Sequence, residues 1–206
     1  MVRTFTKQVE GGVISGSSQE AVDELAAELE RRAADERERE KLFPGDSREQ
    51  MGALARLFPT LRSVVPDRWD TDRFLAWFVT NGGSGGACHA ARFLLNVWNP
   101  STDWREVLAK DEQREIEDDD TESKKVLIKA LKKLRSDLRK DLENEEAEKA
   151  KDRKREPYPV AEERVTAELR KCFTIVGPFN AAAAVGTWDG PHRQAFMKWI
   201  AYPFWP

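Results

Sequence analysis

The residue types that could do chemistry gather in one stretch of the sequence, TNGGSGGACHAARFLLNVWNP, at residues 80–100. It places four glycines, a serine, a cysteine and a histidine directly before a helix-like run. A glycine-rich turn at the start of a helix can bind a phosphate through free backbone N–H groups. A cysteine activated by a histidine can act as a nucleophile. The alternative is a hinge, in which the glycines let two helices pack closely.

The phosphate-loop interpretation lacks residues that the known motifs require. A P-loop carries a lysine after its last glycine, whereas residues 82–86 are followed by Ala87, Cys88 and His89. In a dinucleotide fingerprint that begins at Gly83, the third glycine is replaced by Cys88. The pattern therefore favours a hinge. It leaves a prediction of anion binding at Ser84, Gly85 and Gly86.

The cysteines and histidines do not form a recognisable catalytic or metal site. Neighbouring helical residues point about 100° apart, so Cys88 and His89 cannot readily pair. His192, in WDGPHR, is the remaining candidate base, and it keeps a small enzyme with a site near the turn at residues 82–86 as an alternative. These residues and Cys172 lack the spacings of zinc sites. We therefore predict no catalytic set, metal or cofactor, and favour a protein that is not an enzyme.

The composition favours a cytoplasmic protein. The chain has 206 residues, of which 40% are hydrophobic and 34% charged, with a net charge of −3. Its two cysteines exclude a disulfide scaffold. No N-terminal targeting signal is recognisable, and no apolar run approaches the roughly 18 residues of a membrane span. We expect reduced thiols and no membrane partner.

The spacing of apolar residues predicts an all-α fold: a compact, Trp-rich helical bundle with a long charged amphipathic arm. Asp70 after Trp69 is typical of a helix N-terminus, and Asn99-Pro100 predicts the start of another helix. We expect the helix at residues 18–43 to pack on the arm or on a second copy. The predicted parts are a flexible tail or short hairpin turning at Gly11-Gly12 (1–17), a charged helix (18–43), the first core half (44–110), the arm (111–156) and the second core half (157–206).

Two features predict a surface that binds protein. Leucines recur at helical spacing in the arm, which indicates an amphipathic helix that needs a partner. The tail WIAYPFWP gathers aromatic side chains, which either close the core or anchor a partner. The predicted partner-binding residues are Leu127, Leu131, Leu134, Leu138, Tyr202, Phe204 and Trp205.

The arm also carries blocks of opposite charge. Acidic residues dominate residues 111–122, and basic residues dominate residues 124–140. A basic helix face could follow the phosphates of a nucleic acid; the alternative is that the chain's own acids neutralise it. The candidate nucleic-acid-binding residues are Lys125, Lys129, Lys132, Lys133, Arg135, Arg139 and Lys140.

Three functions are therefore compatible with the sequence. The leading hypothesis is a non-enzymatic interaction or assembly module that binds a protein partner or a second copy of itself. The alternatives are a nucleic-acid-binding accessory protein and a small enzyme with a site near the glycine turn.

Overall fold

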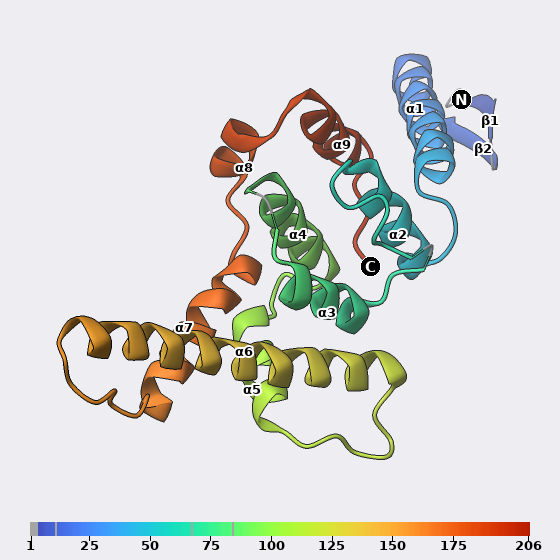
Figure 1. Ribbon diagram of the computed structural model, residues 1–206. Coiled ribbons are helices and arrows are strands. Elements are labelled where there is room, and N and C mark those ends of the chain that lie inside the picture. The colour runs from blue at the N-terminus through green and yellow to red at the C-terminus, as the bar shows by residue number, and fades with distance from the viewer. Residues whose placement is uncertain (1–3, 11, 67, 84) are drawn as a thin grey trace.

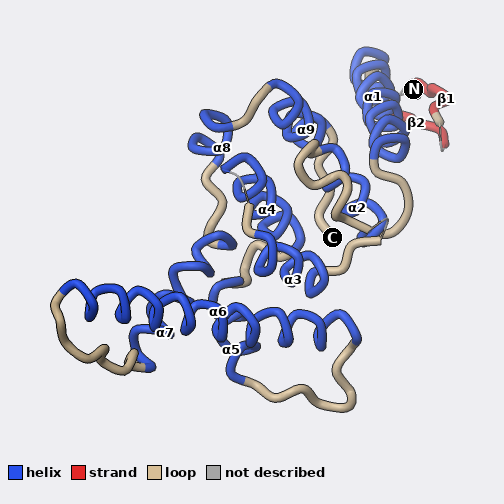
Figure 2. Tube along the Cα trace, viewed as in Figure 1, coloured by secondary structure: helices blue, strands red, loops and turns tan. Residues whose placement is uncertain are grey.

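The computed structural model describes residues 4–10, 12–66, 68–83 and 85–206, and helices dominate this part of the chain (Figures 1 and 2). The predicted all-α class is confirmed, including the long charged helix. The elements are β1 (Phe5–Val9), β2 (Gly12–Gly16), α1 (Gln19–Leu42), α2 (Ser47–Leu57), α3 (Thr71–Asn81), α4 (Gly85–Trp98), α5 (Trp104–Gln113), α6 (Glu122–Asp152), α7 (Glu162–Cys172), the 3-10 helix η1 (Phe173–Val176), α8 (Ala181–Thr187) and α9 (Gly190–Ala201).

The core is a single cluster drawn from both halves of the chain. Trp69 and Trp188 are each 1% exposed, although they lie on opposite sides of the charged segment in the sequence. The ring of Phe58 joins the halves, because its centroid lies 5.7 Å from that of Phe93 and 5.5 Å from that of Trp188. Aromatic rings at these separations contribute stability beyond the area they bury.

Helix starts follow local capping chemistry. Asp70 caps α3 by accepting a hydrogen bond from the backbone N–H of Arg73 at 3.0 Å, as its position in the sequence predicts. The prediction at Asn99 is wrong, because α5 begins at Trp104 and its cap is Asp103. The Asn99 side chain instead accepts hydrogen bonds from the backbone N–H and the hydroxyl of Ser101. An asparagine that closes such a turn competes with helix initiation.

Helix α6 does not stand free, because it packs against α3, α5 and α7. Leu127 and Leu131 are fully buried, and Leu134 and Leu138 pack against the same core. The proposal that this seam binds a partner therefore needs correction: these leucines cover the chain's own helices. The amphipathic pattern identified the buried face but could not identify what covers it.

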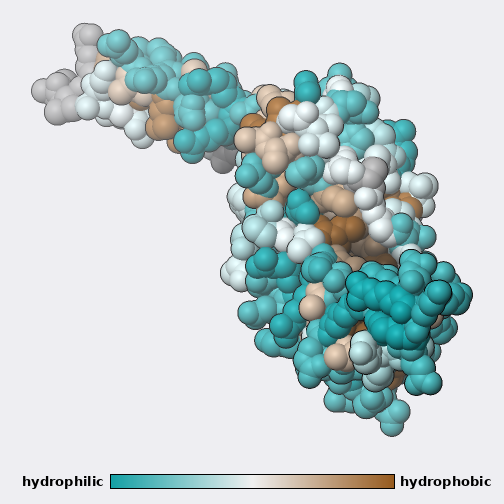
Figure 3. Space-filling view, turned by 60° about the vertical axis from the view of Figure 1, so that its left-hand side comes forward, coloured by the Kyte–Doolittle hydropathy of each residue, from teal (hydrophilic) through white to brown (hydrophobic). Residues whose placement is uncertain are grey.

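The N-terminal residues form a small unit with α1. β1 and β2 pair as an antiparallel hairpin from Phe5↔Gly16 to Val9↔Gly12, and Gly11 of the expected turn lies outside the described residues. α1 packs against this hairpin, burying Val22 and Ala26, instead of packing on the arm. The unit projects from the helical body (Figure 3). Among the described residues, no helix is both long and apolar enough to cross a bilayer.

Candidate functional site

The glycine turn between α3 and α4 is explained by backbone geometry and close packing. Gly82 has φ +63° and its N–H bonds the carbonyl of Phe78 at 2.9 Å, ending α3. A Cβ added at Gly83 would lie 2.9 Å from the Phe78 ring. Both positions therefore need glycine for structural reasons. Of the predicted anion-binding residues, Ser84 lies outside the described residues, and Gly85 and Gly86 form the first turn of α4.

The first turn of α4 is covered by the second half of the core. The indole Nε1–H of Trp188 donates to the carbonyl of Gly86 at 3.0 Å. A Cβ built at Gly85 would lie 3.4 Å from Cγ2 of Thr187. The first turn of α4 therefore meets the WDGPH segment, which contains the candidate base His192.

His192 connects a hydroxyl and a carboxylate. Its Nδ1 lies 2.6 Å from Oδ1 of Asp189, and its Nε2 lies 3.0 Å from Oγ1 of Thr60. Hydrogen bonds from the backbone N–H and then from the ring of His192 lower the pKa of the Asp189 carboxyl. His192 itself is 5% exposed. The three groups thus form a hydroxyl–imidazole–carboxylate series, a geometry found in nucleophilic catalysis.

The sequence indicates part of this arrangement. Asp189 and His192 have the spacing of a cap and the third residue of a helix, so their contact follows from local rules. Thr60 lies 132 positions from His192, and no sequence pattern connects them. The hydroxyl was therefore missed.

The Cys88 thiol bonds to Gly83 instead of to His89, as the directions of the two residues on a helix predict. The Cys88 thiol donates to the Gly83 carbonyl at 3.4 Å, and burial raises the pKa of this thiol. Burial, followed by the nearby charge of Arg92, lowers the pKa of His89. A raised thiol pKa disfavours the reactive thiolate. Among the described residues, no group of three or more potential ligands has a metal-binding arrangement.

No protein-family model, curated protein or solved structure matches this chain.

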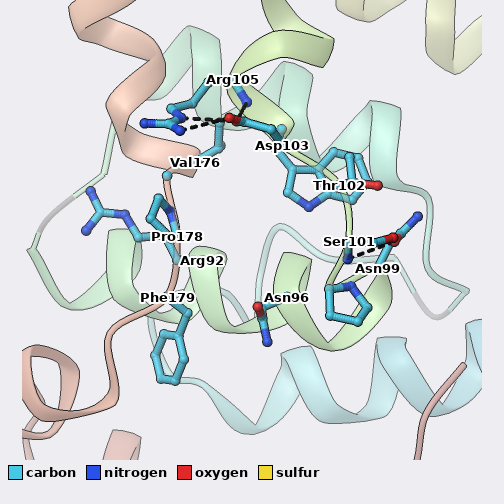
Figure 4. A pocket seen from close by; sticks show the side chains of 13 residues that line it. Arg92, Asn96, Asn99, Ser101, Thr102, Asp103, Arg105, Val176, Pro178 and Phe179 are labelled. Carbon is cyan, nitrogen blue, oxygen red and sulfur yellow. Dashed lines mark hydrogen bonds and ion pairs between the residues drawn. The ribbon is translucent and has the colours of Figure 1, made fainter.

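A pocket of about 240 Å³ lies where the two core halves meet (Figure 4). At one end, Arg105 makes a two-point contact with Asp103, with distances of 3.0 and 2.8 Å, and this lowers the pKa of Asp103 to about 2. Arg92 donates to the carbonyls of Thr174 and Ile175 at 2.9 and 3.1 Å. Both guanidinium groups thus have structural contacts: one at the start of α5 and one that joins α4 to η1.

The aromatic tail is divided between core and surface. Phe204 is 5% exposed, and its ring centroid lies 5.1 Å from that of Phe43. Tyr202 is half-buried against the same core. The partner-binding prediction therefore needs correction at Phe204, because that ring closes the core. Trp205 remains 62% exposed, with its ring edge-on to Trp199 at 5.3 Å.

Ion pairs occupy much of the predicted nucleic-acid-binding face. Lys132 pairs with Glu115 at 2.9 Å, and Arg135 pairs with Glu112 at 3.0 Å. The remaining pairs join Arg135 and Arg139 to Glu162 and Lys125 to Glu122. Within the part of the chain that the structure describes, no ion pair involves the exposed residues Lys129, Lys133 and Lys140.

Proposed function

We propose that the protein is an assembly module that binds a second copy of itself. The observation that carries this proposal is that three large apolar side chains on α9 and in the tail after it are left exposed. Met197, Ile200 and Trp205, hereafter the α9 surface, are 58%, 46% and 62% exposed. The same chain buries Trp69 and Trp188 almost completely. Exposed tryptophan and methionine side chains are typical of interface cores.

Two features of the α9 surface are typical of protein–protein interfaces: a shared helix face and a tryptophan held by a neighbouring ring. Met197 and Ile200 are three residues apart on α9, so they share a helix face. Trp205 is held by its edge-on contact with Trp199, which reduces the rotamer entropy that it would lose on binding. Hydrophobic atoms are also visible at the base of the projecting N-terminal unit (Figure 3).

Charge complementarity favours a second copy as the partner. A cleft of about 250 Å³ beside the end of α9 is lined by Arg32 and Arg39, Asp35 and Glu36, and residues 201–203. In a two-fold dimer each surface meets a copy of itself. A rim with both signs of charge is complementary to itself in that arrangement, whereas a rim of one sign would repel its copy.

Light scattering after gel filtration tests the proposal. We expect the wild-type chain to form a dimer that dissociates on dilution, and the double variant Met197→Ser/Trp205→Ser to be a monomer. Val126→Ser is the matched control, because Val126 is 50% exposed on α6, away from the α9 surface. A monomeric wild type at every accessible concentration would overturn the proposal, as would a double variant that dimerises like the wild type.

A second candidate function is weak binding to nucleic acid. Lys129, Lys133 and Lys140 are four and seven positions apart, so they project within about 40° of one another on the exposed side of α6. If the three lysines neutralise about three phosphates, a plot of the logarithm of the binding constant against the logarithm of the salt concentration should have a slope of about −2.7 on duplex DNA. Fluorescence anisotropy with labelled DNA at low salt tests this function. Charge reversal at the three lysines should abolish the signal, whereas reversal at the paired Lys132 should reduce it less.

A cytoplasmic location belongs to the same proposal. Both cysteines are free, Cys88 half-buried and Cys172 exposed. Free thiols are typical of reducing compartments.

A further inference from the structure

We propose that Thr60, His192 and Asp189 form an acyl-transfer site, with Thr60 Oγ1 as the nucleophile and small activated carboxylic esters as substrates. This site is separate from the α9 surface and does not depend on self-association. It rests on the series Thr60 Oγ1–His192 Nε2 (3.0 Å) and His192 Nδ1–Asp189 Oδ1 (2.6 Å).

The hydrogen bonds assign a role to each ring nitrogen of His192. An ionised Asp189 carboxylate has no proton to donate, so it accepts the proton carried by Nδ1. In the neutral imidazole the other nitrogen, Nε2, is then an acceptor. It faces the Thr60 hydroxyl at 3.0 Å, which is within the range required of a general base. Proton transfer from Thr60 to His192 is therefore geometrically possible.

The imidazole is held in this orientation by aromatic neighbours. The Trp188 ring stacks on it at a centroid distance of 6.4 Å and an interplanar angle of 18°. The centroid of Phe58 lies 6.1 Å away on the same core cluster. Thr60, in contrast, is exposed, so a substrate can approach the hydroxyl from solvent while the base stays sheltered. A hydroxyl hydrogen-bonded to a base that a third group orients is the arrangement that activates a nucleophile for acyl transfer.

Gly86 of α4 packs against the imidazole of His192. Gly86 has no side chain, and a Cβ built on it would lie 3.8 Å from Nε2 of His192. This side of the ring is therefore packed, and a substrate reaches the site from the exposed side of Thr60.

Helix capping explains Asp189 but leaves the imidazole unexplained. Asp189 caps α9 by accepting from the backbone N–H of His192 at 3.0 Å. Asp70 and Asn180 cap α3 and α8 through the same backbone contact, with arginine and alanine at the matching position. The cap therefore needs no histidine. The buried ring adds a connection to a hydroxyl.

The reaction balances without any group beyond substrate and water. Thr60 Oγ attacks the carbonyl carbon while its proton moves to Nε2 of His192. The bond from carbon to the leaving oxygen breaks, and the imidazolium protonates that oxygen. Water then attacks the acyl-threonine, loses a proton to His192, and releases the carboxylic acid as Thr60 regains its proton. Asp189 orients the ring and stabilises its transient positive charge.

Hydrolysis of p-nitrophenyl acetate by the full-length chain tests the site. Because general-base activation contributes at least about a hundredfold, Thr60→Ala should lower p-nitrophenolate release to the level of the free imidazole background. Thr60→Ser keeps the nucleophilic oxygen and should retain activity. Ser63→Ala is the matched control, because Ser63 is an exposed hydroxyl three residues away. Mass spectrometry after acid quenching should find acetyl on the peptide that contains Thr60.

Two further variants separate catalysis from structure. His192→Gln should keep a hydrogen bond to Thr60 but abolish acetylation, whereas Gly86→Ala, whose Cβ would make only ordinary contact with the ring, should keep both fold and activity. Circular dichroism checks that each variant is folded. If His192→Gln unfolds, the surface variants Thr60→Ala and Thr60→Ser still decide the question. Equal rates for wild type and Thr60→Ala, or acetyl groups only on lysines, would overturn the proposal.

Discussion

His192 and Thr60 are 132 positions apart in the chain, yet Nε2 of one lies 3.0 Å from Oγ1 of the other. This hydrogen bond joins the last helix, α9, to the turn that follows α2. It therefore links the two core halves across the charged segment that separates them in the sequence. The same hydrogen bond stabilises the fold and provides the path for proton transfer from Thr60 to His192 in the proposed acyl transfer.

Removing this bond should destabilise the protein measurably. Thr60→Val keeps the shape of the side chain but leaves Nε2 of the buried His192 without its partner. An unsatisfied buried acceptor costs about 1–3 kcal/mol, so the free energy of unfolding in urea should fall by that amount. Thr60→Ser should cost less, because it retains the hydroxyl. A Thr60→Val variant as stable as the wild type would mean that water replaces the hydroxyl without cost.

The leucine seam of α6 should behave as core. Leu131 is fully buried, so Leu131→Ala should lower the free energy of unfolding by about 2–5 kcal/mol. Val126 is 50% exposed on the same helix, and Val126→Ala should change the free energy of unfolding by no more than about 0.5 kcal/mol. Urea denaturation of both variants measures the difference. Similar small effects would show that the seam faces solvent or a partner instead.

Gly82 should not tolerate a side chain. Nothing lies within 4 Å of a Cβ built there, so any cost arises from its backbone conformation, φ +63° and ψ −169°. Gly82→Ala should cost about 1–3 kcal/mol, because non-glycine residues rarely adopt this conformation. Gly186→Ala in α8 is the control, and it should be neutral or stabilise by up to about 1 kcal/mol. Thermal unfolding of the two variants tests this contrast.

Asp103 should make the fold acid-sensitive. Its pKa is lowered to about 2 by hydrogen bonds from the Arg105 side chain and backbone. An aspartate in an unfolded chain has a pKa of about 3.9. As pH falls through this window the unfolded state binds the proton first, so stability is present above about pH 4 and is lost toward about pH 2. Asp103→Asn keeps a residue that caps helices and should remove this part of the acid dependence. Urea midpoints measured at several pH values, for the wild type and the variant, test whether stability falls as the pH is lowered.

The sequence by itself determined the local structure. Apolar spacing predicted the helices, and cap residues such as Asp70 located some of their starts, because these signals act between residues a few positions apart. The predicted helix start at Asn99 is wrong for the same reason, because an asparagine side chain can either cap a helix or close a turn. The end of α3 at a glycine could also be predicted, and Gly82 ends that helix with φ +63°; the hinge itself stays a prediction.

Only the tertiary structure decided which surfaces are covered and which side chains meet. Periodicity identified the face of α6 that carries Leu131, but the packing of α3, α5 and α7 determined that this face is internal. The tail residues Phe204 and Trp205 are neighbours with the same character, and one is buried against Phe43 while the other is exposed. The contact of Thr60 with His192 likewise exists because α9 folds back onto the turn after α2. Such contacts depend on how whole helices pack, which short-range patterns do not encode.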